Sequence, residues 1–230
     1  MLIHGYRIRA AILAGALAAG GVAGVAVAQS ATATTGSHAN TAASPAGPTA
    51  GLTQYTDTYK VQSPYNLPES ARFSITGGVY NTWILKGDKP FSPGSSTGAR
   101  TELRWNTNWS SGEHLWEADV EIDPGTTGTC IMQVHVNGQG EAIYIQTKNG
   151  NLYNSVNTLL ARNIVGSWFH LAAAYNPTSH LVQIWVNNTL ALTTHYTKSA
   201  GTQFYFKNGV YNLSGAKSET HFKNIELWRQ

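Results

Sequence analysis

The sequence has a single cysteine, Cys130, which excludes an internal disulfide, so stability has to come from a packed core. Cys130 stands in the apolar stretch Thr129-Cys130-Ile131-Met132, which indicates a buried, unreactive thiol rather than a nucleophile. No pair of histidines has the spacing of metal ligands, and we expect neither a metal nor an organic cofactor. Few windows place apolar residues at helical spacing, which argues against a helical fold.

Charge is also scarce, because Asp, Glu, Lys and Arg make up only 12% of the chain. There are 15 Lys and Arg against 12 Asp and Glu. Without Arg7 and Arg9, which lie near the N-terminus, the counts become 13 and 12, a net charge of about +1. Nucleic acid is therefore not an expected partner, although a local basic cluster could still bind an acidic ligand.

The N-terminal segment has the composition of an export signal. Arg7 and Arg9 precede an apolar run over residues 10–27, which is rich in Ala, Gly, Val and Leu. An Ala-Val-Ala pattern at 26–28 follows the small-x-small rule of signal peptidase sites. A membrane anchor is the alternative, but stop-transfer charges do not flank the run. We predict a signal peptide over 1–28, no membrane partner after its cleavage, and a secreted, extracellular protein.

A linker and one domain are expected after the signal. Residues 29–50 are nearly all Ser, Thr, Ala, Gly, Asn and Pro, which cannot bury enough apolar surface to offset the entropy of ordering. The remaining segment, 51–230, has the length of one domain with its own core. We expect this domain to be a monomer.

Alternation of apolar and polar residues recurs along this domain between clusters of Gly, Asn, Pro and Ser, which predicts an all-β fold. The clearest predicted strands are Trp116–Ile122, Cys130–Val136, Ala142–Thr147, Trp168–Tyr175, Leu181–Val186 and Phe204–Tyr211. Predicted turns lie at 123–125, 137–138, 149–150, 176–177 and 187–188. So many strands in one domain favour a two-sheet antiparallel jelly-roll sandwich, in which a concave sheet forms a groove.

Three segments place polar, donor-rich side chains on one face of a strand and apolar side chains on the other. The polar sets are Arg100, Glu102 and Arg104 in residues 100–104, Gln133 and His135 in residues 130–136, and Tyr205, Lys207 and Tyr211 in residues 204–211. The combined set lacks a second carboxylate. A glycoside hydrolase ordinarily needs two, whereas a lyase acting on a uronate needs donors that neutralise the sugar carboxylate, together with a base and an acid.

The three segments RTELR, QVH and YFKNGVYN resemble, in order and spacing, the signature motifs of the alginate lyases of polysaccharide lyase family seven. The resemblance implies a concanavalin-like jelly roll with a concave substrate cleft, and endo-type β-elimination of an acidic polysaccharide that leaves unsaturated oligouronates. It implies that Arg100, Gln133 and His135 bind and neutralise the carboxylate. Tyr211 matches the catalytic tyrosine, and His135 is the base where the C5 proton lies on its side of the ring.

The same resemblance suggests which residues bind substrate. These are Glu102, Arg104, Tyr205, Lys207 and Asn212. Lys207 is expected to hold the carboxylate of a neighbouring sugar, and Glu102 to orient the two arginines by bidentate pairing. The valine of QVH implies a preference for mannuronate-rich blocks. Loops over 88–98 and 149–157 are expected to shape the choice of sugar.

Three alternatives remain open at this point. Glu117, Asp119 and Glu121 share one strand face, as in jelly-roll glycoside hydrolases, although an acidic solvent face explains the same pattern. A glucuronan lyase is a second alternative, since related jelly-roll lyases degrade that β-linked polyuronate and the sequence does not exclude it. A non-catalytic module could bind an acidic polysaccharide or an organic acid in the same cleft.

Overall fold

The computed structural model describes residues 47–138 and 140–230. The predicted signal peptide and residues 29–46 of the predicted linker lie outside the described residues. The described residues fall in one compact unit, Ala43–Gln230. Within them, no helix is both long enough and apolar enough to cross a membrane.

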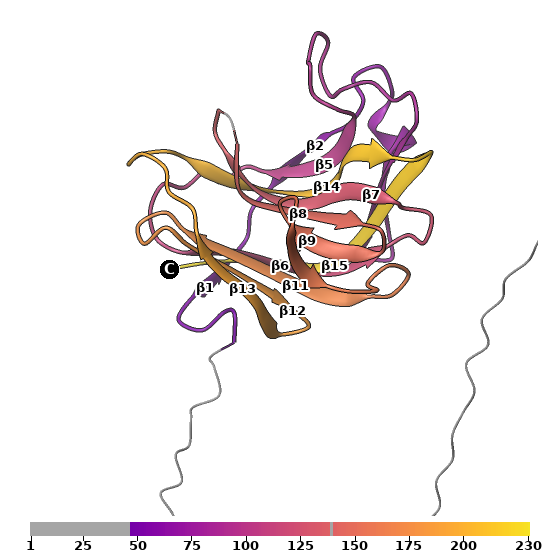
Figure 1. Cartoon of the computed structure of the whole chain (residues 1–230). Coiled ribbons are helices and arrows are strands. Elements are labelled where there is room, and N and C mark those ends of the chain that lie inside the picture. The colour runs from indigo at the N-terminus through magenta and orange to yellow at the C-terminus, as the bar shows by residue number, and fades with distance from the viewer. Residues whose placement is uncertain (1–46, 139) are drawn as a thin grey trace, which may run out of the picture. The chain divides into compact units, whose positions relative to one another are not determined.

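Two antiparallel sheets stack as layers (Figure 1). The eight-stranded sheet has the order β13-β12-β11-β6-β15-β4-β3, with β1 paired to β15. Its strands are β1 (Thr53–Tyr55), β3 (Phe73–Thr76), β4 (Val79–Leu85), β6 (His114–Ile122), β11 (Phe169–Asn176), β12 (Leu181–Val186), β13 (Thr189–His195) and β15 (Lys217–Arg229). A short 3-10 helix, η1 (Glu69–Ala71), precedes β3.

The seven-stranded sheet has the order β10-β9-β8-β7-β14-β5-β2. Its strands are β2 (Tyr59–Gln62), β5 (Arg100–Trp105), β7 (Gly128–Val136), β8 (Glu141–Lys148), β9 (Asn151–Asn154), β10 (Thr158–Ala161) and β14 (Phe204–Ser214). The strands of the three motif segments, β5, β14 and β7, are consecutive neighbours in this sheet. The all-β, two-sheet prediction is confirmed.

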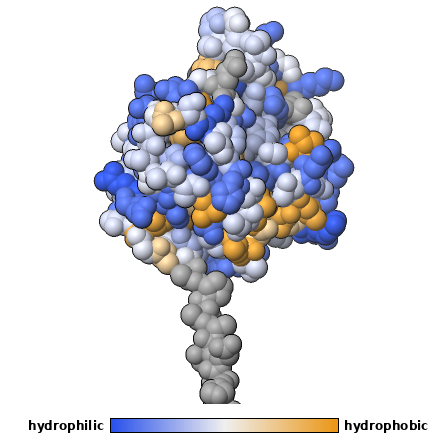
Figure 2. Space-filling model, turned by 60° about the vertical axis from the view of Figure 1, so that its left-hand side comes forward, coloured by the Kyte–Doolittle hydropathy of each residue, from blue (hydrophilic) through white to orange (hydrophobic). Residues whose placement is uncertain are grey.

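The core lies between the two sheets, where alternate residues of each strand point inward. Trp116, Val120 and Ile122 of β6 meet inward-facing residues of the other sheet such as Val134 and Phe206, and all are buried. Apolar residues are thereby removed from water, as the predicted alternation requires. The surface in Figure 2 is correspondingly hydrophilic over most of the visible face, with hydrophobic residues in smaller patches.

The six predicted strands are all present and begin within two residues of their predicted starts. Two predicted turns, Asn149-Gly150 and Asn187-Asn188, have positive φ at both residues, with values of 51° and 77° in the first and 50° and 61° in the second. This conformation suits Asn and Gly and matches the twist of a two-residue hairpin.

Candidate active site

Strand register brings the three motifs together although they lie far apart in the sequence. Strand β14 runs between β7 and β5, so the polar residues of its cleft face lie beside polar residues of the neighbouring strands. Tyr205 pairs with His135, and Tyr211 pairs with Arg100. Lys207 lies between Gln133 and Arg104. The polar side chains predicted to share one strand face therefore gather on one face of the seven-stranded sheet.

A carboxylate lies at the centre of this cluster. Glu102 accepts hydrogen bonds from Gln133 Nε2 at 2.5 Å and from Lys207 Nζ at 2.5 Å. Arg100 Nη1 is 3.3 Å from the same carboxylate. Glu102, Lys207 and Gln133 are each about 1% exposed, so water screens these interactions little. One carboxylate thus fixes the positions of three donor side chains.

This arrangement differs from two expectations. Glu102 does not pair with both arginines, because Arg104 turns away to Asn108 Oδ1 at 2.7 Å and to the carbonyl oxygen of Trp105. Lys207 does not reach toward a neighbouring sugar, because its ammonium is buried and bound to Glu102. Burial lowers the pKa of Lys207, and the Glu102 carboxylate opposes this change.

Arg100 links the buried cluster to the surface of the cleft. Its guanidinium carbon lies 4.1 Å from the ring centroid of Tyr211 and 4.9 Å from that of Phe91. Its Nε is buried and has no hydrogen-bond partner among the described residues. A buried donor without a partner costs free energy, whereas the rest of the guanidinium is available at the cleft that Arg100 lines.

His135 is held with one ring nitrogen free. Its Nδ1 lies 2.6 Å from the carbonyl oxygen of Val136, which can only accept, so Nδ1 carries the hydrogen and Nε2 keeps its lone pair. Nε2 is 3.8 Å from Glu141 Oε1, which is too far for a hydrogen bond. Burial, and then the positive charge of Lys207, lowers the pKa of His135. This geometry and this pKa favour a neutral imidazole that can accept a proton.

An aromatic stack forms the rim beside His135. The rings of His135 and Tyr205 are 5.2 Å apart at an angle of 17°, and Arg104 covers the Tyr205 ring at 4.0 Å. Arg104 and Tyr205 therefore fix the plane of the imidazole. The predicted residues Arg100, His135, Tyr205, Lys207 and Tyr211 line a cleft of about 350 Å³.

Sequence reasoning missed several residues that line the same cleft. Phe91 and Thr97 come from the loop expected to influence sugar choice, and Gln62 and Glu141 come from neighbouring strands. A bidentate pair between Arg72 and Asp88, with both N–O distances at 2.7 Å, anchors the start of that loop. These residues belong to no motif, so only the fold reveals that they face the cleft.

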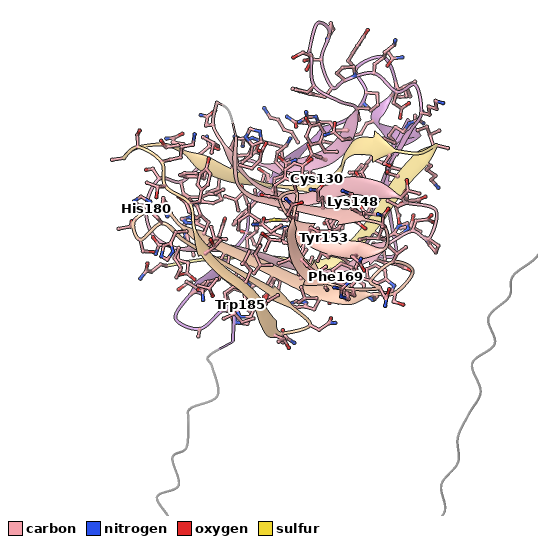
Figure 3. The ribbon with its side chains drawn as sticks, viewed as in Figure 1. Cys130, Lys148, Tyr153, Phe169, His180 and Trp185 are labelled. Atoms are coloured by element: carbon pink, nitrogen blue, oxygen red, sulfur yellow. The ribbon has the colours of Figure 1, made fainter. Side chains whose placement is uncertain are left out.

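Cys130 also lies on the cleft side of the sheet, because a register shift between Cys130 and Met132 interrupts the alternation of β7. Ile131 and Met132 both pack into the core, whereas Cys130 lines a neighbouring pocket of about 360 Å³ with Tyr144 and Asn212. Figure 3 labels Cys130 on this sheet. The predicted burial of the thiol is confirmed, and burial raises its pKa well above the usual value.

The segment after Tyr211 forms a bulge, where Asn212 adopts a φ of +63°. Thr129 Oγ1 lies 3.0 Å and 2.8 Å from the carbonyl oxygens of Tyr211 and Asn212. Gly209, with a φ of +144°, lets β5 approach closely, since a Cβ there would be 2.2 Å from the Thr101 carbonyl oxygen. The glycine and the bulge together position the Tyr211 side chain in the cleft.

The three acidic residues of the hydrolase alternative lie on the other sheet. Glu117 and Asp119 occupy the face of β6 directed away from the core, as predicted for an acidic outer face. His170 binds between them, at 3.3 Å from Glu117 and 3.2 Å from Asp119, and the hydrogen bond to Glu117 raises the pKa of His170. Trp228 Nε1 donates to Glu117 at 2.8 Å. These carboxylates are therefore remote from the cleft that the motif residues line.

Comparison with known proteins agrees with this fold. A curated citrate-binding protein of Hevea brasiliensis is 31% identical over 193 residues, which cover 80% of each chain. An alginate lyase of polysaccharide lyase family 7 has a TM-score of 0.63 at 20% identity, covering 75% of this chain and 94% of its own. An alginate lyase from Pseudomonas aeruginosa has a TM-score of 0.62 at 19% identity, covering 75% and 98%. The family described as alginate lyase matches residues 54–228, and the chain belongs to this family.

Proposed function

We propose that this protein is a secreted, monomeric, endo-acting polyuronate lyase that cleaves alginate, with a preference for mannuronate-rich blocks, and releases unsaturated oligouronates. The observation that carries the proposal is the convergence of Arg100, Gln133, His135 and Tyr211 on one sheet face. Arg100, His135 and Tyr211 line the cleft, and Gln133 lies beneath it on Glu102. The family to which the chain belongs supports the same activity.

The first step of the reaction is neutralisation of the sugar carboxylate. Arg100, which lines the cleft, is the donor that meets the carboxylate, Gln133 supports it from beneath the cleft, and Glu102 holds both in place. Hydrogen bonds to the carboxylate stabilise the negative charge that develops on it when the C5 proton leaves. Because the donors are already ordered, they need no reorganisation during the reaction.

Proton transfer then completes the elimination. For a sugar whose C5 proton faces His135, Nε2 takes that proton, the C4–O bond breaks and a C4=C5 double bond forms. The Tyr211 hydroxyl gives a proton to the departing glycosidic oxygen. For the epimer with the proton on the opposite face, Tyr211 does both jobs. Each cleavage yields one chain with a new unsaturated end and one with a free hydroxyl.

The direct test follows the ultraviolet absorbance of the conjugated double bond that elimination creates. The purified protein is incubated with poly-mannuronate, poly-guluronate, glucuronan and a neutral β-glucan. Absorbance should rise fastest with poly-mannuronate and should be lost in His135→Ala. Glu121→Gln, a change on the outer face of the other sheet, serves as the control and should keep full activity. If glucuronan is cleaved fastest, glucuronan replaces alginate as the proposed substrate. If the β-glucan releases reducing ends without a rise in absorbance, the lyase proposal is overturned.

A second candidate is a binding module without activity. The Hevea brasiliensis relative is a citrate-binding protein, and the Arg100 guanidinium at the cleft is suited to any carboxylate. This candidate predicts no absorbance change with any polyuronate. It also predicts that citrate binding gives a saturable heat signal in calorimetry and that Arg100→Ala abolishes this signal. An enzyme that turns over a polyuronate would rule it out.

The pH dependence of kcat/KM is a further prediction. His135 must be neutral to accept a proton, and its pKa lies below the ordinary histidine value of about 6.5. Activity on a substrate that uses this base should therefore persist below pH 6.5 and fall only as the pH drops through the lowered pKa. Initial rates at low substrate concentration, measured from about pH 4 to about pH 8, test this prediction. An acid limb centred above 6.5 would contradict the assignment.

A further inference from the structure

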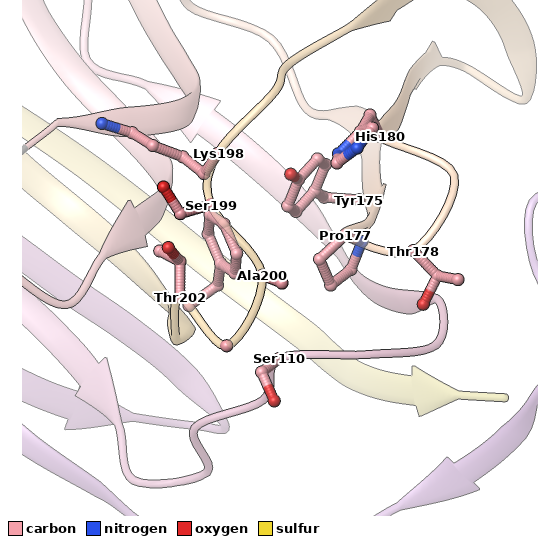
Figure 4. Close-up of a pocket in the computed structure, with 11 residues that line it drawn as sticks. Ser110, Tyr175, Pro177, Thr178, His180, Lys198, Ser199, Ala200 and Thr202 are labelled. Carbon is pink, nitrogen blue, oxygen red and sulfur yellow. The ribbon is translucent and has the colours of Figure 1, made fainter.

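A second pocket of about 350 Å³ lies at one end of the sandwich, outside the cleft. Three connecting loops form it: the one before β6, the turn between β11 and β12, and the loop between β13 and β14. In Figure 4, Lys198, Ser199 and Thr202 line one side, and His180, Pro177 and Thr178 line the other. We call it the end pocket.

Hydrogen bonds between the loops hold the end pocket open without a ligand. The backbone N–H of Tyr196 donates to the carbonyl oxygen of His180 at 2.9 Å, and the Tyr175 hydroxyl donates to that of Tyr196 at 2.9 Å. Gly112 N–H donates to Thr178 Oγ1 at 3.3 Å. The walls are thus connected to one another, and a preformed pocket binds with little ordering cost.

His180 has two features that its turn does not require. Its φ is +62°, a left-handed conformation that costs a non-glycine residue free energy and that Asn or Gly would adopt more readily. Its Nδ1 is buried and has no hydrogen-bond partner among the described residues. An imidazole held in a strained backbone position at the wall of a pocket points to a role in binding a ligand there.

The residues that line the end pocket favour a negatively charged ligand. Ser110, Ser199 and Thr202 contribute hydroxyl groups, and Lys198 is an exposed, flexible cation whose Nζ lies 5.9 Å from the Tyr196 ring. None of the described residues that line the pocket is acidic. Hydroxyl groups, an imidazole and an ammonium together fit a carboxylate flanked by hydroxyl groups.

We propose that the end pocket is a second binding site for a hydroxyl-bearing carboxylate, such as a terminal uronate or a small hydroxy acid. The His180 imidazole and Lys198 bind the carboxylate, and the serine and threonine hydroxyls bind the neighbouring hydroxyl groups. Phe204 of β14 lines the end pocket, whereas the next residue, Tyr205, points to the opposite face of the strand and lines the cleft. The proposal does not depend on lyase activity.

The test is a nuclear magnetic resonance titration of the full chain with glucuronate, tartrate and glucose. None of these has a glycosidic bond to eliminate, so the result is independent of catalysis. Glucuronate should shift the backbone amides of residues 178–180 and 198–202 in a saturable way, and glucose should not. If tartrate shifts the same amides with a lower dissociation constant than glucuronate, the ligand of the end pocket is a small hydroxy acid and the proposed site stays the same.

Two variants locate the binding groups. His180→Asn keeps a residue that tolerates the left-handed backbone, and Lys198→Met keeps the side-chain length without the charge. Each should weaken the end-pocket titration about tenfold while shifts at the cleft amides of Gln133 and Lys207 stay as in the parent. Unchanged melting temperatures confirm that the variants fold. Shifts confined to the cleft, equal shifts with glucose, or unaltered affinity in His180→Asn would overturn the proposal.

Discussion

Tyr211→Phe is expected to lower kcat on the preferred polyuronate by about a thousandfold, because acid and base catalysis by one side chain contributes about 10²- to 10⁴-fold. The ring should stay over Arg100, whose guanidinium lies 4.1 Å from its centroid, so carboxylate binding and KM should change little. Initial rates of absorbance increase give kcat, and calorimetry with the inactive variant gives the affinity.

Tyr205→Phe is the matched control for this change. Tyr205 lines the same cleft and also lies beneath an arginine, but its ring stacks on His135 rather than facing Arg100. Loss of its hydroxyl should leave the stack in place and reduce kcat only a few-fold. Equal losses in the two variants, or a Tyr211→Phe enzyme that keeps a tenth of the parent rate, would show that the Tyr211 hydroxyl is not the proton donor.

Glu102→Ala is expected to lower the free energy of unfolding by about 3–5 kcal/mol. The change leaves the Lys207 ammonium buried without its carboxylate and leaves a cavity next to Gln133. Urea denaturation followed by tryptophan fluorescence measures the effect. A loss below about 1 kcal/mol would mean that water screens the pair, as it screens ion pairs at protein surfaces.

A double variant separates stability from function at the same position. Glu102→Leu with Lys207→Met replaces the buried ion pair by apolar side chains of similar size, a change that is often neutral or stabilising. The double variant should regain most of the stability lost in Glu102→Ala. Its activity should remain low, because Arg100 and Gln133 have lost the carboxylate that orients them. Full activity would show that Glu102 serves the fold alone.

Much of the site follows from the period of a strand. Because side chains alternate, the sequence places Gln133 and His135 opposite Met132 and Val134, and the structure shows that division. Alternation says which face a side chain takes, but it does not say what the side chain meets there. The pairing of Lys207 with Glu102, and the turn of Arg104 toward Asn108, depend on neighbouring strands and loops.

Irregular backbone accounts for most of the features that the sequence did not predict. Strand β15, the longest in the described chain, was not among the clear predictions, because a register shift between Lys223 and Glu226 breaks its alternation. Asn224, within this shift, has a φ of +53°. The end pocket is built from loops, whose contacts no periodic pattern predicts. The signal peptide, the linker and secretion stay predictions.

The register shift in β7 places Cys130 on the cleft side of the sheet, where the reactivity of its thiol reports local opening of the structure. The thiol is the only one in the sequence, it is 1% exposed, and it lies beside Tyr211 in the register of β14. A thiol reagent can therefore reach it only when the side chains that cover it in its pocket, such as Tyr144 and Asn212, move aside. The labelling rate reports those openings, and its slowing by a bound oligosaccharide would measure how firmly the ligand holds this part of the sheet closed.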